Sequence, residues 1–234
     1  MNRSITPPPA RLLLGEVRGA LEPARLLLRA PLIATLPRGR GAHVVLLPGY
    51  GATESSTAVL QGFVKLLGYR SHSWGLGRNT GNVAKLLPRV LARIDEIAAS
   101  GDEVHLLGWS LGGYIAREAA RERPARFQSV ITLGSPVVGG PKYTTVARRY
   151  RRRGHDLDEL ERLVDARYER PLAVPVTAIF SKADGIVAWE ACIDRRSPGI
   201  EHVEVRTTHI GLGFCPEVYR IIADRLARHS RRAH

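Results

Sequence analysis

Residues 103–113 read EVHLLGWSLGG. A short strand-like run, Glu103 to Leu107, leads directly into Gly-x-Ser-x-Gly, and a helical pattern continues from Leu111 to about Arg121. The motif is informative in this setting, because a serine on a sharp turn between a buried strand and a helix exposes its hydroxyl at the edge of the sheet. The glycines allow the tight turn and leave room for the neighbouring backbone. We therefore interpret Ser110 as a candidate nucleophile; the alternative is a glycine-rich turn with a capping serine.

On both sides of this stretch, short apolar runs alternate with helix-length amphipathic segments. The pattern predicts strands over 43–47, 70–74, 103–107, 129–133, 174–180 and 202–206, and helices over 57–67, 83–99, 111–121, 156–168 and 216–228. This alternation indicates an α/β fold, with a mostly parallel central sheet and helices on both faces. A length of 234 residues predicts a single domain over 1–234.

Two segments depart from the alternation. Residues 10–36 or so are apolar in bursts that charged residues interrupt, and we interpret them as one or two amphipathic helices, split near Pro23, that lie on the body. A peripheral membrane anchor is the alternative. Residues 137–171 are too long for an ordinary connection, and they are rich in charge. We expect this insertion to have structure of its own.

An acid and a histidine follow the two last predicted strands. Asp184 lies just beyond the strand that ends at Phe180, and His209 lies just beyond the strand that ends near Arg206. Because the carboxyl ends of parallel strands meet at one edge of the sheet, Ser110, Asp184 and His209 are expected to lie together there. Their order along the chain is that of a nucleophile, an orienting acid and a base. Singly, Asp184 could be a turn former and His209 a strand-end histidine; together they favour a catalytic triad.

Two backbone amides are candidates for an oxyanion hole. Leu111 follows the nucleophile, and Tyr50 lies in the Pro-Gly-Tyr-Gly turn after the first predicted strand. Gly49 would let this turn approach a substrate closely, and Trp109 would shape the pocket, unless Trp109 is simply a core residue. Nucleophilic catalysis of this kind requires neither a metal nor an organic cofactor.

The charge is strongly basic, with a formal net charge of +13, and 31 of the 35 basic residues are arginine. The arginines are spread along the chain, which does not favour a nucleic-acid site, because such a site would cluster its charge. The one dense run is Arg148 to Arg153, interpreted as a solvated face or as a surface for anionic lipid or acidic substrate. No uninterrupted apolar segment resembles a signal peptide or a spanning helix, so we expect a cytoplasmic protein.

The two cysteines, Cys192 and Cys215, follow Asp184 and His209 closely in the sequence. A disulfide between the two loops is conceivable, but reduced thiols are the interpretation that suits a cytoplasmic protein. The glycines of residues 75–81 are similar to a dinucleotide fingerprint, but their spacing is wrong by one residue.

Six segments carry a resemblance to a known family: LPGYG (47–51), WGLGRN (74–79), GWSLGG (108–113), LGSP (133–136), SKADGIV (181–187) and THIGL (208–212). From His43 to the last helix the chain resembles the α/β-hydrolase superfamily, in particular its small bacterial serine esterase and lipase-like members. The resemblance implies triad roles for Ser110, Asp184 and His209 and oxyanion roles for Tyr50 and Leu111. It also implies a cap-like function for residues 137–171. One departure is Pro48-Gly49, where many relatives have His-Gly, and it bears on the second oxyanion donor.

The function implied is that of a carboxylic-ester hydrolase that works through an acyl-enzyme on a small or lipid-like ester. The charged insertion favours an esterase over a true lipase. A lipase, an acyltransferase that uses the same triad and a non-catalytic binding protein on the same fold are the alternatives.

Overall fold

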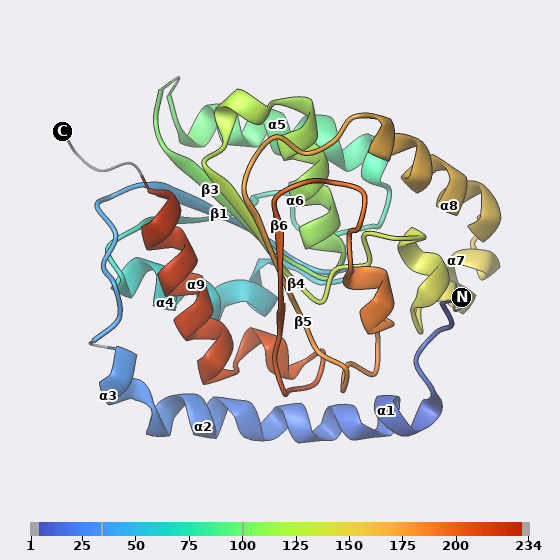
Figure 1. Cartoon of the computed structure of the whole chain (residues 1–234), viewed down its shortest axis with the longest axis horizontal. Helices are drawn as coiled ribbons and strands as arrows, with labels where there is room; N and C mark the ends of the chain where they lie inside the picture. The colour runs from blue at the N-terminus through green and yellow to red at the C-terminus, as the bar shows by residue number, and fades with distance from the viewer. Residues whose placement is uncertain (1–4, 34, 100, 231–234) are drawn as a thin grey trace.

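A parallel sheet of six strands forms the centre of the computed structural model, which describes residues 5–33, 35–99 and 101–230 (Figure 1). Every pair of neighbouring strands is parallel, in the order β2-β1-β3-β4-β5-β6. The strands are β1 His43–Leu47, β2 Arg70–Ser73, β3 Val104–Trp109, β4 Ser129–Leu133, β5 Val176–Phe180 and β6 Ile200–Glu204. The predicted fold class is thereby confirmed, with a sheet that is parallel throughout the described residues.

Helices cover both faces of this sheet. The helices are α1 Ala10–Gly15, α2 Glu22–Leu28, α3 Ala30–Ile33, α4 Ala58–Leu66, α5 Val83–Ile97, α6 Leu111–Glu122, α7 Ala147–Arg152, α8 Leu157–Ala166 and α9 Pro216–His229. Val44 and Leu46 of β1 point to the face covered by α4 and α9, whereas Val45 and Leu47 point to the face covered by α5 and α6. This alternation follows from the two-residue period of a strand, and it divides the core into two layers.

Local sequence explains where several helices begin. The Asn82 side chain accepts a hydrogen bond from the N–H of Lys85 and caps α5, and Asp156 accepts from the N–H groups of Asp158 and Glu159 and caps α8. Pro216 occupies the first turn of α9, where its missing N–H has no intrahelical partner to lose. The ends of the five predicted helices agree with those of α4, α5, α6, α8 and α9 to within a few residues.

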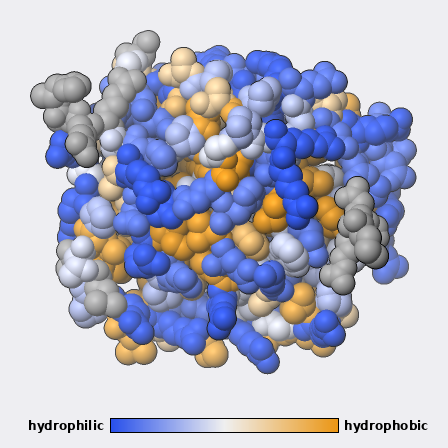
Figure 2. All heavy atoms as spheres, in the orientation of Figure 1, coloured by the Kyte–Doolittle hydropathy of each residue, from blue (hydrophilic) through white to orange (hydrophobic). Residues whose placement is uncertain are grey.

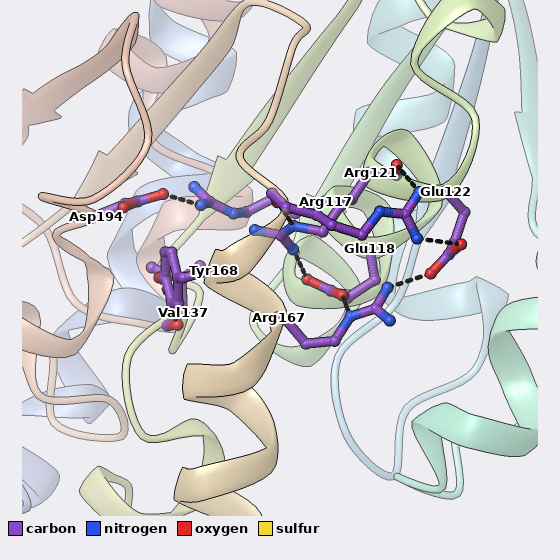
Figure 3. Close-up of polar contacts among 9 residues, drawn as sticks. Arg117, Glu118, Arg121, Glu122, Val137, Arg167, Tyr168 and Asp194 are labelled. Carbon is purple, nitrogen blue, oxygen red and sulfur yellow. Dashed lines mark hydrogen bonds and ion pairs between the residues drawn. The ribbon is translucent and has the colours of Figure 1, made fainter.

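The insertion forms η4 Gly140–Tyr143, α7, α8 and η5 Arg167–Glu169. A partly buried ionic network fixes it to α6, the helix that follows Ser110 (Figure 3). Arg167 of the insertion pairs with Glu118 and Glu122 of α6, and Arg121 of α6 also pairs with Glu118. Arg170 of the insertion also pairs with Glu122, so two arginines of η5 and its C-terminal end hold the insertion to α6.

The N-terminal segment is a nearly continuous run of α1, η1 Glu16–Leu21, α2 and α3 along one edge of the molecule (Figure 1). Pro23 lies in the first turn of α2, so the run changes helix type there, close to the expected split. Gly19 packs so closely that a Cβ atom would lie 2.6 Å from the Thr208 hydroxyl oxygen. The segment therefore lies on the body beside the loop that carries His209.

Candidate active site

Ser110 lies on a strained turn between β3 and α6. Its φ of 54° is the only positive φ among non-glycine residues in the part of the chain that the structure describes. The flanking glycines are required sterically: a Cβ on Gly108 would lie 2.4 Å from Gly113, and one on Gly112 would lie 2.2 Å from the Leu47 carbonyl oxygen. The prediction that these glycines leave room for the neighbouring backbone is confirmed. Backbone strain of this kind persists only where the surroundings impose it, and it is common at functional sites.

The turn opens into a cavity of about 240 Å³ at the carboxyl edge of the sheet. From β1 the chain continues to β2 on one side of β1, and then crosses to β3 on the other side of β1. The strand order therefore reverses between β1 and β3. Ligands of open α/β sheets bind at such a switch point. The cavity lining is mostly apolar and comes from the segments that follow β1, β3, β4, β5 and β6: Gly49, Tyr50, Ala52, Ser56, Trp109, Ser110, Leu111, Pro136, Pro141, Thr144, Val146, Tyr150, Ile186, Val187 and His209.

Asp184 and His209 form a buried pair beside Ser110. The Nδ1 atom of His209 lies 2.6 Å from Oδ2 of Asp184, and both side chains are buried. The other carboxylate oxygen, Oδ1, accepts hydrogen bonds from the N–H groups of Ile186 and Val187 at 2.8 and 2.7 Å. Both oxygens of Asp184 are thus held in place, and His209 is oriented with Nδ1 toward the acid and its ring on the cavity that Ser110 also lines.

Burial and neighbouring negative charge act in opposite directions on the pKa of His209. Burial alone would lower its pKa, but the charge and hydrogen bond of Asp184, together with the charge of Glu16, outweigh burial and raise the pKa above the usual histidine value. A histidine with a raised pKa is a stronger base, and its imidazolium form is stabilised when it takes up a proton.

The two expected oxyanion donors lie at the same cavity. Leu111 is the first residue of α6, so its N–H has no acceptor within the helix. A Cβ on Gly49 would lie 3.3 Å from the Cβ of Ser110, so the turn after β1 reaches the serine closely. The Tyr50 hydroxyl accepts a hydrogen bond from Arg153 at 2.7 Å, which ties this turn to the insertion. Two arginines of the 148–153 run, Arg149 and Arg153, lie over the Tyr50 ring.

One residue at the site was missed in the sequence. Glu16 of η1 is buried and accepts hydrogen bonds from the N–H groups of Gly185 at 2.7 Å, His209 at 2.9 Å and Ile210 at 2.9 Å. These amides belong to the two loops that carry the Asp–His pair. A buried carboxylate with three amide donors is well satisfied. Glu16 therefore joins both loops and adds negative charge next to His209.

The variant Glu16→Gln should show activity that persists to lower pH than in the wild type. Removal of the Glu16 charge removes one of the causes that raise the His209 pKa, so the base stays neutral at lower pH. The measurement is the acid limb of kcat/KM against pH, with a soluble p-nitrophenyl ester. Glu22→Gln is the matched control, because Glu22 is buried in the same segment but bonds the Thr207 hydroxyl instead. A Glu16→Gln limb that coincides with that of the wild type would contradict the electrostatic role.

Other acids and the two cysteines lie outside the Asp184–His209 pair. The Asp194 carboxylate pairs with buried Arg117. Cys192 and Cys215 are free, so the conceivable disulfide is absent; they are buried in separate apolar clusters, and burial raises the pKa of both thiols. Within the described residues, no group of three or more His, Cys, Asp or Glu side chains is placed to hold a metal ion. None of the helices there is both long enough and apolar enough to cross a membrane.

A strained serine turn beside a buried Asp–His pair, at the carboxyl edge of a parallel sheet, is typical of serine hydrolases with α/β architecture. The chain belongs to the alpha/beta hydrolase family, whose model matches residues 22–233. It is 36% identical over 104 residues to a pimeloyl-[acyl-carrier protein] methyl ester esterase of Aeromonas hydrophila, and 31% identical over 112 residues to the mitochondrial palmitoyl-protein thioesterase ABHD10 of Bos taurus. These matches cover 42% and 44% of this chain, and 39% and 36% of the relatives' own lengths.

Solved structures agree on the fold. A monoacylglycerol lipase of Paleococcus ferrophilus aligns with a TM-score of 0.61 at 19% identity, over 82% of this chain and 97% of that one. The mouse alpha/beta hydrolase domain-containing protein 10 aligns with a TM-score of 0.60 at 20% identity, over 82% of this chain and 90% of that one. The family model confirms the expected family, and esterases are among the relatives.

Proposed function

We propose that the protein is a serine carboxylic-ester hydrolase in which Ser110 is the nucleophile, His209 the base and Asp184 the orienting acid. The observation that carries the proposal is the 2.6 Å contact between Asp184 and His209, with the His209 ring and Ser110 on one cavity. Each step of acyl transfer then has a group to perform it.

In the first step, His209 takes the proton of the Ser110 hydroxyl while the serine oxygen attacks the ester carbonyl. The carbonyl oxygen becomes an oxyanion, which the N–H groups of Leu111 and Tyr50 stabilise. The protonated His209 then gives its proton to the departing alcohol, which leaves an acyl-enzyme. Water, activated by His209, releases the carboxylic acid and restores Ser110. No resident metal or organic cofactor takes part in this proposal.

The cavity supports a preference for short acyl groups. Its volume of about 240 Å³ lies below the range of roughly 300–1,000 Å³ that is usual for pockets of drug-sized ligands. The insertion contributes Pro141, Thr144, Val146 and Tyr150 to the lining, which gives it a cap-like role in the choice of substrate. None of these four side chains is charged. The charged residues of the insertion therefore do not line the cavity and do not disfavour the binding of apolar acyl groups. Trp109 and Gly49, on the same cavity, complete the proposed substrate site.

The test is hydrolysis of p-nitrophenyl acetate, butyrate, octanoate and palmitate. We expect kcat/KM for butyrate to exceed that for palmitate by at least about tenfold, because a palmitoyl chain is too large for a cavity of about 240 Å³, and a steric cost of about 1.4 kcal/mol already corresponds to tenfold. A maximum at palmitate would favour a lipase instead. Since relatives by name act on a methyl ester and a palmitoyl thioester, a butyryl thioester is a useful additional substrate. Turnover of none of these would favour the non-catalytic alternative.

The cytoplasm is the compartment that we propose. Two free, buried cysteines suit a reducing environment, in which structural disulfides are rare.

A further inference from the structure

The N-terminal helical run presents apolar side chains to solvent and carboxylates to the protein. Five of its apolar side chains are more than 60% exposed: Leu14 75%, Val17 77%, Leu21 64%, Leu27 76% and Leu28 81%. Its two acids, Glu16 and Glu22, are only 6% and 4% exposed. A helix that lies on a protein body ordinarily buries its leucines and exposes its charges. This run instead exposes these five apolar side chains and buries both carboxylates, so its outer face is suited to contact with something other than water.

The charge on this outer face has one sign. Because Glu16 and Glu22 are buried, the exposed charged side chains of residues 10–33 are all arginine: Arg11, Arg18, Arg25 and Arg29. Arginine and apolar residues alternate at helical spacing, as in the series 11, 14, 18, 21, 25 and 28. Figure 2 shows the result, with apolar side chains that project among hydrophilic ones along the edge where Figure 1 places α1 and α2. Such a mixture suits a partner that is both anionic and apolar.

Grooves beside the run continue this character. One groove, of about 1,000 Å³, lies between the run and the β5 and β6 loops, and its lining includes Leu14, Val17, Arg18 and Arg206. A second, of about 700 Å³, lies beside α9, and its lining includes Leu28, Arg29 and Arg220. Both grooves combine leucine side chains with guanidinium groups, and these outnumber the exposed carboxylates of the two linings, Glu204 and Glu217. This chemistry suits phosphate headgroups above acyl chains.

We propose that the outer face of residues 10–33 is a docking surface for an anionic lipid membrane. The helices would lie in the plane of the interface, with Leu14, Val17 and Leu21 inserted among the acyl chains and the arginines at the level of the headgroups. This is the peripheral anchor that the sequence left as an alternative. Membrane contact would also bring the catalytic side of the molecule near lipid. Ile210, next to His209, is 43% exposed. It packs against the run at Gly19, where an added Cβ would lie 3.3 Å from the Cβ of Ile210.

The experiment is flotation of the full chain with vesicles of phosphatidylcholine alone and of phosphatidylcholine mixed with phosphatidylglycerol. The wild type should float with the mixed vesicles and bind the neutral ones at least about tenfold more weakly, because each arginine near an anionic surface contributes about 1 kcal/mol, or roughly fivefold. Two triple variants, Leu14→Gln/Val17→Gln/Leu21→Gln and Arg11→Gln/Arg18→Gln/Arg29→Gln, should each lose at least about tenfold in binding to the mixed vesicles.

The matched control is Leu66→Gln/Leu163→Gln, which removes two leucines that are each 58% exposed on other helices. It should float like the wild type, and all variants should share the thermal midpoint of the wild type, since the replaced side chains are exposed. The proposal is overturned if the wild type stays unbound, if it binds neutral vesicles equally well, or if the leucine variant binds like the wild type. A wild type that is dimeric without vesicles and does not float, with a monomeric leucine variant, would assign the face to a second copy of the chain.

Discussion

Ser110→Ala should lower kcat/KM for p-nitrophenyl butyrate by about 10⁴-fold or more, because removal of the nucleophile of a serine triad costs up to about 10⁶-fold. The stability should change little. Alanine experiences the same positive φ as serine at this turn, and the Ser110 N–H keeps its 2.7 Å hydrogen bond to the Leu133 carbonyl. The measurement is steady-state hydrolysis with a thermal melt of each protein.

Ser55→Ala is the matched control, because Ser55 is an exposed hydroxyl residue outside the cavity lining. It should retain the activity of the wild type within a few fold. If Ser110→Ala hydrolysed the ester as fast as Ser55→Ala, the proposed nucleophile would be wrong.

Asp184→Asn should lower kcat by about 10³ to 10⁴-fold while the protein remains folded. An asparagine oxygen can still accept from the Ile186 and Val187 amides, but its NH₂ group then faces Nδ1 of His209. That nitrogen must become the acceptor, so Nε2 carries the proton and cannot take one from Ser110. The same substitution in a serine protease triad costs about 10⁴ in kcat.

The residual activity of Asp184→Asn should also extend to lower pH. The Asp184 charge and hydrogen bond raise the His209 pKa, so their loss lowers it, and the base stays neutral in more acidic solution. The control is Asp158→Asn, at an exposed acid of the insertion that pairs with Lys142. An Asp184→Asn enzyme with the rate and pH profile of the control would show that Asp184 does not orient the base.

Much of the site could be predicted because it depends on local patterns. Ser110 follows a buried apolar strand, and Asp184 and His209 come within a few residues of the next strand ends, so the parallel sheet alone brings them to one edge. The predicted strand over 202–206 lies two residues too far along, since β6 is Ile200–Glu204. β6 is an edge strand that is only partly buried, so its apolar pattern is weak.

The contribution of the N-terminal run could not be predicted. Glu16 looks like a surface charge in the sequence, because its partners are backbone amides from residues about 170 to 190 positions away. A helix that lies on a protein body is expected to bury its leucines, whereas the structure turns Leu14 and Leu21 outward and buries Glu16 and Glu22. Periodicity alone cannot reveal that a helix packs through its carboxylates, because backbone donors leave no trace in the residue pattern.

The proposed acyl transfer depends above all on Ser110 as the nucleophile, with His209 as its base. The most direct test is the intact mass of the protein after incubation with a serine-directed fluorophosphonate, followed by peptide mapping. With Ser110 as the nucleophile, we expect one adduct per chain, on Ser110, absent in Ser110→Ala and slow to form in Asp184→Asn. A folded wild type that gains no adduct, or gains one on another residue, would contradict it.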